Sequence, residues 1–209
     1  MTSLRRNLRL YLVTDPQLCG SVGVVETVRQ AVAGGVSMVQ LRDKTATTAE
    51  RVSLARALGE VLSGSGVPLV INDDVEAAIL ADMDGAHIGQ DDMTPAQARA
   101  RLGPDKILGL SCETEQSVTA ADPSIVDYLG LGPVFGTETK TDHKAPIGFD
   151  GLAHLVALSS MPNVAIGGLK APHQSRVQHS GADGLAVVSA ICGQPDITAA
   201  ARAFSTNES

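Results

Sequence analysis

The chain has 209 residues, a length at which one domain can bury a substantial hydrophobic core. Its formal net charge of -7 argues against a protein that binds nucleic acid through the phosphates, since such proteins carry a basic face. No apolar run reaches the roughly 18 residues of a membrane span, and no signal-peptide core follows the N-terminus, so we expect a cytoplasmic protein. The odd number of cysteines, without a CxxC pair, predicts reduced and partly buried thiols.

Short apolar runs alternate with segments of helical periodicity along the chain. The runs are rich in Val, Ile and Leu and too short for independent helices, which is typical of buried parallel strands. In chain order, the predicted strands are Leu10–Thr14, Ser37–Leu41, Pro68–Ile71, Gly85–Ile88, Lys106–Leu110, Asp127–Leu131, Asn163–Ile166 and Gly184–Val188. The predicted helices are Val24–Ala33, Thr48–Leu62, Val75–Ala81, Pro95–Leu102, Gln116–Ala120, Gly151–Leu158, Pro172–Gln178 and Ile197–Phe204.

Eight strands that alternate with eight helices indicate an α/β protein, a single-domain (β/α)8 TIM barrel. We expect the barrel to span residues 1–209, with 205–209 as a disordered tail. An open, doubly wound sheet is the alternative architecture. The GxGxxG motif that usually follows the first strand of such a sheet is missing, which favours the barrel.

Polar side chains follow several predicted strands, where the active sites of such barrels lie. After the second strand, Gln40, Arg42 and Lys44 point to one side of the extended chain by alternation. Two cations and an amide on one side can cradle a diphosphate. A solvated strand end is the alternative interpretation of this segment.

Acidic residues follow the third and fourth strands, in Asn72-Asp73-Asp74 and Gln90-Asp91-Asp92. Carboxylates on adjacent strands can share one Mg²⁺, an ion that prefers oxygen ligands and often bridges to substrate phosphates. One member of each pair could instead cap the helix that follows. The matching positions of the two pairs, beside the cationic cluster, favour a metal site.

The later strands are followed by segments suited to phosphate groups. The loop after the sixth strand carries Thr137, Thr139 and Lys140, whose hydroxyls and positive charge suit oxyanions. The seventh and eighth strands end in Gly167-Gly168 and Val188-Ser189, where backbone N–H groups commonly bind phosphate in this fold.

Two other features carry weaker signals. Ser111 closes the fifth strand, where a local turn bond explains a serine as well as a role in the site does. The five histidines show no metal-binding spacing, and we assign none of them a catalytic role. His87 lies in the fourth strand and points either into the barrel or toward the site.

In this order and spacing, the segments resemble the thiamine phosphate synthase (thiamin-phosphate pyrophosphorylase) family over nearly the full chain. The motifs are YLVTD at 11–15, VQLRDK at 39–44, IND at 71–73, HIGQDD at 87–92, GPVF at 132–135, TETK at 137–140, IGG at 166–168 and VSAI at 188–191. Two residues depart from the family pattern: Gly136 stands where proline is common, and Phe149 where leucine is more usual. Neither departure removes a proposed contact.

The resemblance implies a transferase that condenses 4-amino-2-methyl-5-hydroxymethylpyrimidine diphosphate with thiazole phosphate, or its carboxylated form. The products would be thiamine phosphate and pyrophosphate. The family mechanism is dissociative: a pyrimidine methylene cation forms, and the thiazole nitrogen then captures it. Such a step needs no enzyme nucleophile, which agrees with the absence of a nucleophile motif from the sequence.

The resemblance also implies roles for individual residues. Asp73 and Asp92 would ligate one Mg²⁺ per active site. The pyrimidine diphosphate would be held by Gln40, Arg42, Lys44, Asn72, Ser111 and Lys140, of which Arg42, Lys44, Ser111 and Lys140 would be catalytic. The thiazole phosphate would be bound by Thr137, Thr139, Gly168, Val188 and Ser189.

Two other functions stay open at this point. A thiazole tautomerase of the same fold, or a phosphate-binding barrel without activity, has little use for a site that binds Mg²⁺ and a diphosphate. Arg42, Lys44, Asp73 and Asp92 therefore favour the synthase. The expected partners are two phosphorylated small molecules and neither nucleic acid nor a membrane, and the sequence leaves a homo-oligomer open.

Overall fold

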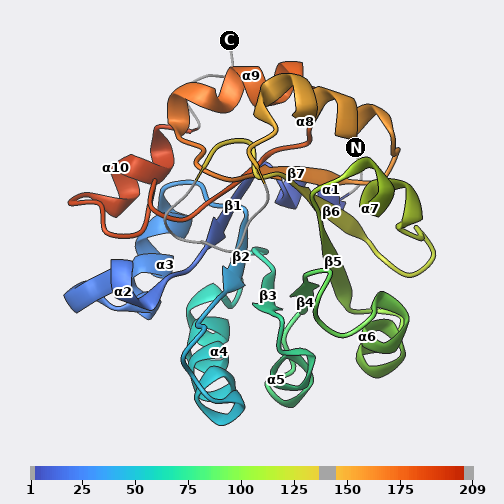
Figure 1. Cartoon of the computed structure of the whole chain (residues 1–209). Coiled ribbons are helices and arrows are strands. Elements are labelled where there is room, and N and C mark those ends of the chain that lie inside the picture. The colour runs from blue at the N-terminus through green and yellow to red at the C-terminus, as the bar shows by residue number, and fades with distance from the viewer. Residues whose placement is uncertain (1–2, 137–144, 205–209) are drawn as a thin grey trace.

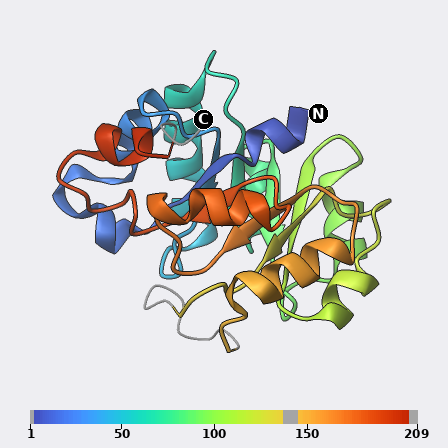
Figure 2. The ribbon, with the colours of Figure 1, turned by 90° about the horizontal axis from the view of Figure 1, so that it is seen from above.

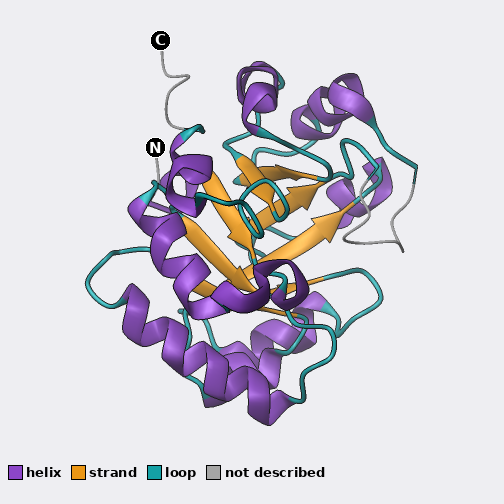
Figure 3. Cartoon of the chain, turned by 90° about the vertical axis from the view of Figure 1, so that its left-hand side faces the viewer, coloured by secondary structure: helices purple, strands orange, loops and turns teal. Residues whose placement is uncertain are grey.

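The computed structural model describes residues 3–136 and 145–204. Eight parallel strands form a closed barrel in sequence order, and β8 (Leu185–Val187) pairs with β1 (Leu10–Val13) to complete it. Helices surround the strands, which lie at the centre of the molecule (Figures 1 and 3). The predicted barrel is confirmed, and the alternative of an open sheet is wrong. The expectation for residues 205–209 lies outside the described residues.

The elements alternate as the sequence pattern predicts. The other strands are β2 (Met38–Leu41), β3 (Leu69–Asn72), β4 (Gly85–Ile88), β5 (Ile107–Cys112), β6 (Tyr128–Leu131) and β7 (Asn163–Ile166). The helices are α1 (Ser3–Asn7), α2 (Pro16–Cys19), α3 (Val24–Ala33), α4 (Thr48–Leu62), α5 (Val75–Leu80), α6 (Pro95–Leu102), α7 (Glu115–Ala120), α8 (Gly148–Ala157), α9 (Gln174–His179) and α10 (Ile197–Arg202), with 3-10 turns at Gly20–Val22 and Ala171–His173. Among the described residues, no helix is both long and apolar enough to cross a membrane.

Most predicted boundaries agree with the structure to within one or two residues, and the differences have local causes. The helix expected from Gly151 begins at Gly148, whose N–H donates to the Val134 carbonyl at 3.0 Å and so ends the preceding loop. The helix expected over Pro172–Gln178 is a 3-10 turn followed by α9. The short helix α2 was not predicted, although Asp15 caps it by accepting from two backbone N–H groups.

Alternation along the strands separates two sets of buried side chains. One cluster fills the barrel interior and includes Tyr11, Tyr128, Met38, Val70 and Val164. The larger cluster lies between the strands and the helices and consists mainly of Val, Leu, Ile and Ala. The three cysteines belong to this outer cluster as free thiols, and they are buried more completely than predicted.

The helix ring closes where α10 packs against α3, as Figures 1 and 2 show from two directions. The Thr198 hydroxyl donates to the Gln30 carbonyl at 3.0 Å across this contact. Gly34, at the end of α3, allows the close approach, because a Cβ there would lie 2.5 Å from the Thr198 carbonyl oxygen and 2.6 Å from the Ala201 Cβ.

We expect Gly34→Ala to destabilise the fold, because the new Cβ forces α10 away from α3. The loss should be about 1–3 kcal/mol, as for other overpacked sites. The control is Gly59→Ala inside α4, where the new Cβ would meet only the flexible end of Met83, with the Cε at 3.4 Å and the Sδ at 3.7 Å. Alanine should stabilise that helix by ~0.5–1 kcal/mol. Thermal unfolding measures both changes, and equal midpoints for the two variants would contradict the tight α3–α10 contact.

Candidate active site

A cavity of about 390 Å³ opens at the C-terminal ends of the strands. The predicted site residues that line it are Gln40, Arg42, Lys44, Asn72, Asp73, Asp92, Ser111, Gly168, Val188 and Ser189. Thr137, Thr139 and Lys140 lie outside the described residues. Every predicted site residue that the structure describes is therefore brought to one cavity. A more open groove, at the opposite ends of the strands beside α4, contains none of them.

The chain beyond β2 carries two cations to one end of the cavity. It is held against the chain beyond β1, since the Thr14 N–H donates to the Gln40 carbonyl at 2.9 Å and the Arg42 N–H donates to the Thr14 hydroxyl at 3.0 Å. The Arg42 guanidinium lies 3.8 Å from the Asp15 carboxylate. Together with Lys44, Arg42 gives this end of the cavity a cationic character that suits a diphosphate.

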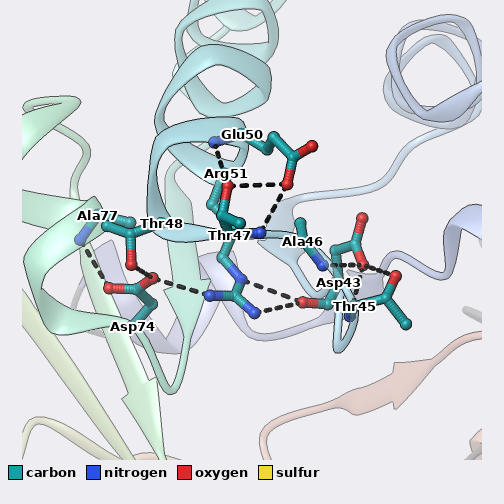
Figure 4. Close-up of polar contacts among 9 residues, drawn as sticks. All are labelled: Asp43, Thr45, Ala46, Thr47, Thr48, Glu50, Arg51, Asp74 and Ala77. Carbon is teal, nitrogen blue, oxygen red and sulfur yellow. Dashed lines mark hydrogen bonds and ion pairs between the residues drawn. The ribbon is translucent and has the colours of Figure 1, made fainter.

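Arg51 of α4 connects the cationic segment to the acidic one (Figure 4). Its Nε and Nη2 donate to the Asp43 carbonyl at 3.0 and 2.9 Å. Its Nη1 donates to the Asp74 carboxylate at 2.9 Å. Asp43 lies between the two cations in the sequence, and Asp74 follows Asp73. One guanidinium therefore fixes the position of one segment relative to the other.

The two aspartates after β3, Asp73 and Asp74, have different structural roles. Asp74 accepts from the Ala77 N–H at 2.9 Å and caps α5, which confirms one part of the alternative considered from the sequence. Asp73 lines the cavity with a backbone φ of 62°, a left-handed conformation that is uncommon and strained outside glycine. Its N–H donates to the His87 carbonyl at 2.8 Å, which holds the turn in place.

The Asp73 and Asp92 carboxyl groups meet at the cavity wall. Loss of water around Asp73, followed by the contact with Asp92, raises the pKa of Asp73 to about 6, against the opposing effects of Asn72 and Arg42. Two carboxylates this close repel each other unless a proton or a cation lies between them. Asp92 is oriented by the Gly89 N–H, which donates to it at 2.7 Å.

This pair fits a magnesium ion better than a metal with many protein ligands. No group of three or more acidic, histidine or cysteine side chains suited to a metal occurs among residues 3–136 and 145–204. Mg²⁺ commonly binds one or two carboxylates and takes its other ligands from water and substrate phosphates. Two carboxylates beside a cationic cradle therefore suit an ion that also contacts a diphosphate.

The opposite end of the cavity is formed by glycines after β7 and by the turn after β8. Gly167 and Gly168 have φ values of 105° and 60°. A Cβ on Gly168 would lie 2.8 Å from the Phe135 Cβ and 2.9 Å from the Gly136 carbonyl oxygen. Only glycine fits there, and the backbone itself becomes the cavity surface. Val188, which begins the turn after β8, lies on the same wall, so a phosphate group can approach main-chain N–H groups closely.

A chain of hydrogen-bonded side chains crosses the barrel interior beside the cavity. The Gln40 Nε2 donates to the Tyr11 hydroxyl at 2.7 Å, and the Tyr11 and Tyr128 hydroxyls are 2.8 Å apart. The Tyr128 hydroxyl lies 2.8 Å from the His87 Nδ1, and the His87 Nε2 lies 2.9 Å from the Ser111 Oγ. His87 therefore lies inside the barrel and also lines the cavity, so both orientations considered from the sequence apply.

Two glycines make room for this chain. A Cβ on Gly109 would lie 2.2 Å from the Tyr128 ring and 2.4 Å from the His87 Nδ1. A Cβ on Gly130 would lie 3.2 Å from the His87 Cε1. The sequence analysis missed Tyr11 and Tyr128. The available signal was that both tyrosines of the chain lie in predicted strands whose neighbours are apolar.

Comparison with known proteins identifies the family. The family model for thiamine monophosphate synthase matches residues 10–191. A thiamine-phosphate synthase from Azorhizobium caulinodans is 48% identical over 96% of this chain and 94% of its own length, and one from Xanthobacter autotrophicus is 52% identical over 95% and 94%. The solved thiamine phosphate pyrophosphorylase from Pyrococcus furiosus is 33% identical, with a TM-score of 0.87 over 97% of this chain and 96% of that one. The resemblance inferred from the motifs is confirmed: the chain belongs to the thiamine monophosphate synthase family of transferases.

Proposed function

We propose that the cavity condenses 4-amino-2-methyl-5-hydroxymethylpyrimidine diphosphate with thiazole phosphate, or its carboxylated form, to give thiamine phosphate and pyrophosphate. The main support is a single cavity with two different ends. Arg42, Lys44 and the Asp73–Asp92 pair lie at one end, and the glycine-rich backbone after β7 lies at the other. A cavity that seats a diphosphate and a monophosphate together can join the two molecules that carry them.

The first end would hold the pyrimidine diphosphate. Arg42 and Lys44 supply charge to the diphosphate, and Gln40, Asn72 and Ser111 supply polar contacts to the same substrate. Lys140 would add a third cation. Negative charge grows on the diphosphate as its bond to the pyrimidine methylene breaks, and cations positioned beforehand stabilise that charge without reorganisation.

One magnesium ion per site would be held by Asp73 and Asp92. When bound, it supplies positive charge to the oxygens of the leaving diphosphate. The chemistry of the donor set supports this role, since the two carboxylates repel each other without a cation.

The second end would hold the thiazole phosphate through Gly168, Val188 and Ser189, with Thr137 and Thr139 as further contacts. The methylene cation left by the departing diphosphate needs only a nucleophile in line with it. Holding the thiazole nitrogen at that position converts its capture into an intramolecular step. No protein nucleophile is required.

Incubation of the purified protein with both substrates and Mg²⁺ should give thiamine phosphate and pyrophosphate. A tautomerase would instead isomerise the carboxylated thiazole phosphate alone, and a barrel without activity would do neither. The acidic pair beside the cations favours the synthase over both. Failure to form thiamine phosphate would refute the proposal.

We expect Asp92→Ala to lower turnover on the order of a hundredfold, because charge stabilisation by a catalytic metal is worth several kcal/mol. The fold should survive, since Asp92 is an exposed loop residue. Asp91→Ala is the matched control, because it removes the same charge from the same loop at a residue without a proposed role. Steady-state kinetics and circular dichroism measure the two outcomes, and equal losses in both variants would show that general charge matters rather than a metal ligand.

We expect Arg51→Ala to lower kcat/KM for the pyrimidine diphosphate roughly tenfold, or about 1.4 kcal/mol, because residues that orient ligands usually act on that scale. The loss should appear mainly in KM, since Arg51 holds Asp43 and Asp74 rather than the reacting atoms. Arg56→Ala removes the same charge from the same helix, at a residue whose Nη2 donates to the Leu80 carbonyl at 2.8 Å and not to the segments beside the cavity. Similar KM values for the two variants would refute a role of the Arg51 contacts in binding.

A further inference from the structure

We propose that the polar chain in the barrel has one proton order, in which His87 is the Nε2–H tautomer and Ser111 presents its hydroxyl proton to the cavity. Ser111 then acts as a hydrogen-bond donor, and its partner on the substrate must be an acceptor, such as a ring nitrogen or a phosphate oxygen. Tyr128 and His87 are positioning residues that act through Ser111. The identity of the acceptor rests on the proposed function, whereas the proton order does not.

The number of protons in the chain is set by the state of its members. Burial raises the pKa of both Tyr11 and Tyr128 above the usual range of a phenol, so each tyrosine is neutral and carries one hydroxyl proton. Three links join Tyr11, Tyr128, His87 and Ser111, and each link needs one proton between its two heavy atoms. The two tyrosines, a neutral histidine and the serine together carry four protons, one more than the three links require. The hydroxyl at one end of the chain, Tyr11 or Ser111, therefore has a proton that takes part in none of these links.

Burial decides which end keeps that proton. Tyr11 borders the cavity but is only 1% exposed, and its oxygen already accepts from the Gln40 Nε2. If the order ran from Ser111 toward Tyr11, the Tyr11 proton would have no acceptor among the described residues, and a buried donor without an acceptor is costly. In the opposite order Tyr11 donates to Tyr128, Tyr128 donates to the His87 Nδ1, and the His87 Nε2–H donates to Ser111.

The surplus proton then belongs to Ser111, which is half-buried and lines the cavity. Water or a substrate can accept it there. A doubly protonated His87 fails for the same reason as the reversed order. Its Nδ1–H would donate to the Tyr128 hydroxyl, so Tyr128 would donate to Tyr11. The Tyr11 hydroxyl proton would again have no acceptor among the described residues.

One substitution in this series of hydrogen-bonded side chains breaks the proton order and leaves every cavity-lining residue unchanged. Tyr128, unlike the other four members of the chain, does not line the cavity. Tyr128→Phe keeps the ring that fills the space beside Gly109 and removes the donor to the His87 Nδ1. Without that donor, Tyr128 no longer fixes which His87 ring nitrogen carries the proton, and Ser111 is no longer held as a donor to the cavity.

The first test is a double-mutant cycle in the synthase assay. We expect Tyr128→Phe to lower kcat roughly tenfold, the size expected for one lost hydrogen bond. In a Ser111→Ala background, the same substitution should cost less than about twofold, because the group on which it acts is gone. An unchanged kcat in the single variant, or an equal loss in both backgrounds, would overturn the positioning role.

The second test needs no activity. In the full-length wild-type protein labelled with ¹⁵N-histidine, the His87 Nε2 should show the chemical shift of a protonated imidazole nitrogen and Nδ1 that of an unprotonated one. The His87 signals are those that disappear in His87→Gln. Protonation at Nδ1 would overturn the proton order even in an active enzyme. A protein that has the Nε2–H tautomer but makes no thiamine phosphate would refute the proposed function and leave the proton order intact.

Discussion

The pairing of β8 with β1 is the constraint on which the site depends. All eight strands are parallel, so their C-terminal ends meet at one rim, and closure turns that rim into the wall of a single cavity. Neighbouring strands lie about 4.8 Å apart. In an open sheet of the same strand order, the charged segments after β2, β3 and β4 would therefore stand well away from the glycines after β7. Closure places the two groups around one cavity.

Closure also limits what the barrel can contain. Each strand has only three to six residues, so few layers of side chains fill the interior. Part of this space is occupied by the chain from Gln40 to Ser111 instead of aliphatic side chains. Buried polar groups stabilise a structure only when each finds a partner, and this chain provides one at every step. Positions 109 and 130 are glycine, because a side chain there would crowd the rings of Tyr128 and His87.

Two kinds of feature could be predicted from the sequence: elements with a repeating apolar pattern, and polar residues that directly follow a strand. The eight strands and the helices from α3 onward have clear periodicity, and the predicted site residues after strands two to five all line the cavity. Features that depend on distant positions could not be predicted. Tyr11 and Tyr128 are separated by most of the barrel in sequence, and Arg51 has the appearance of an ordinary surface charge on a helix. The departure at Phe149 is similar: its ring packs against Phe135, with centroids 5.3 Å apart, and lies 4.1 Å from the Arg176 guanidinium.

The charge distribution gives the proposed reaction a further consequence. The chain carries a net charge of -7, and the end of the cavity that would receive the most negative substrate contains Asp73 and Asp92. These carboxylates repel a diphosphate, and each other, unless a divalent cation lies among them. A diphosphate likewise attracts such a cation. Each ligand therefore makes the site more favourable for the other, and by linkage the increase in affinity is the same in both directions. In the proposed reaction, an acidic pair inside the phosphate site would thus couple the binding of the substrate to that of the metal, which cationic side chains alone would not do.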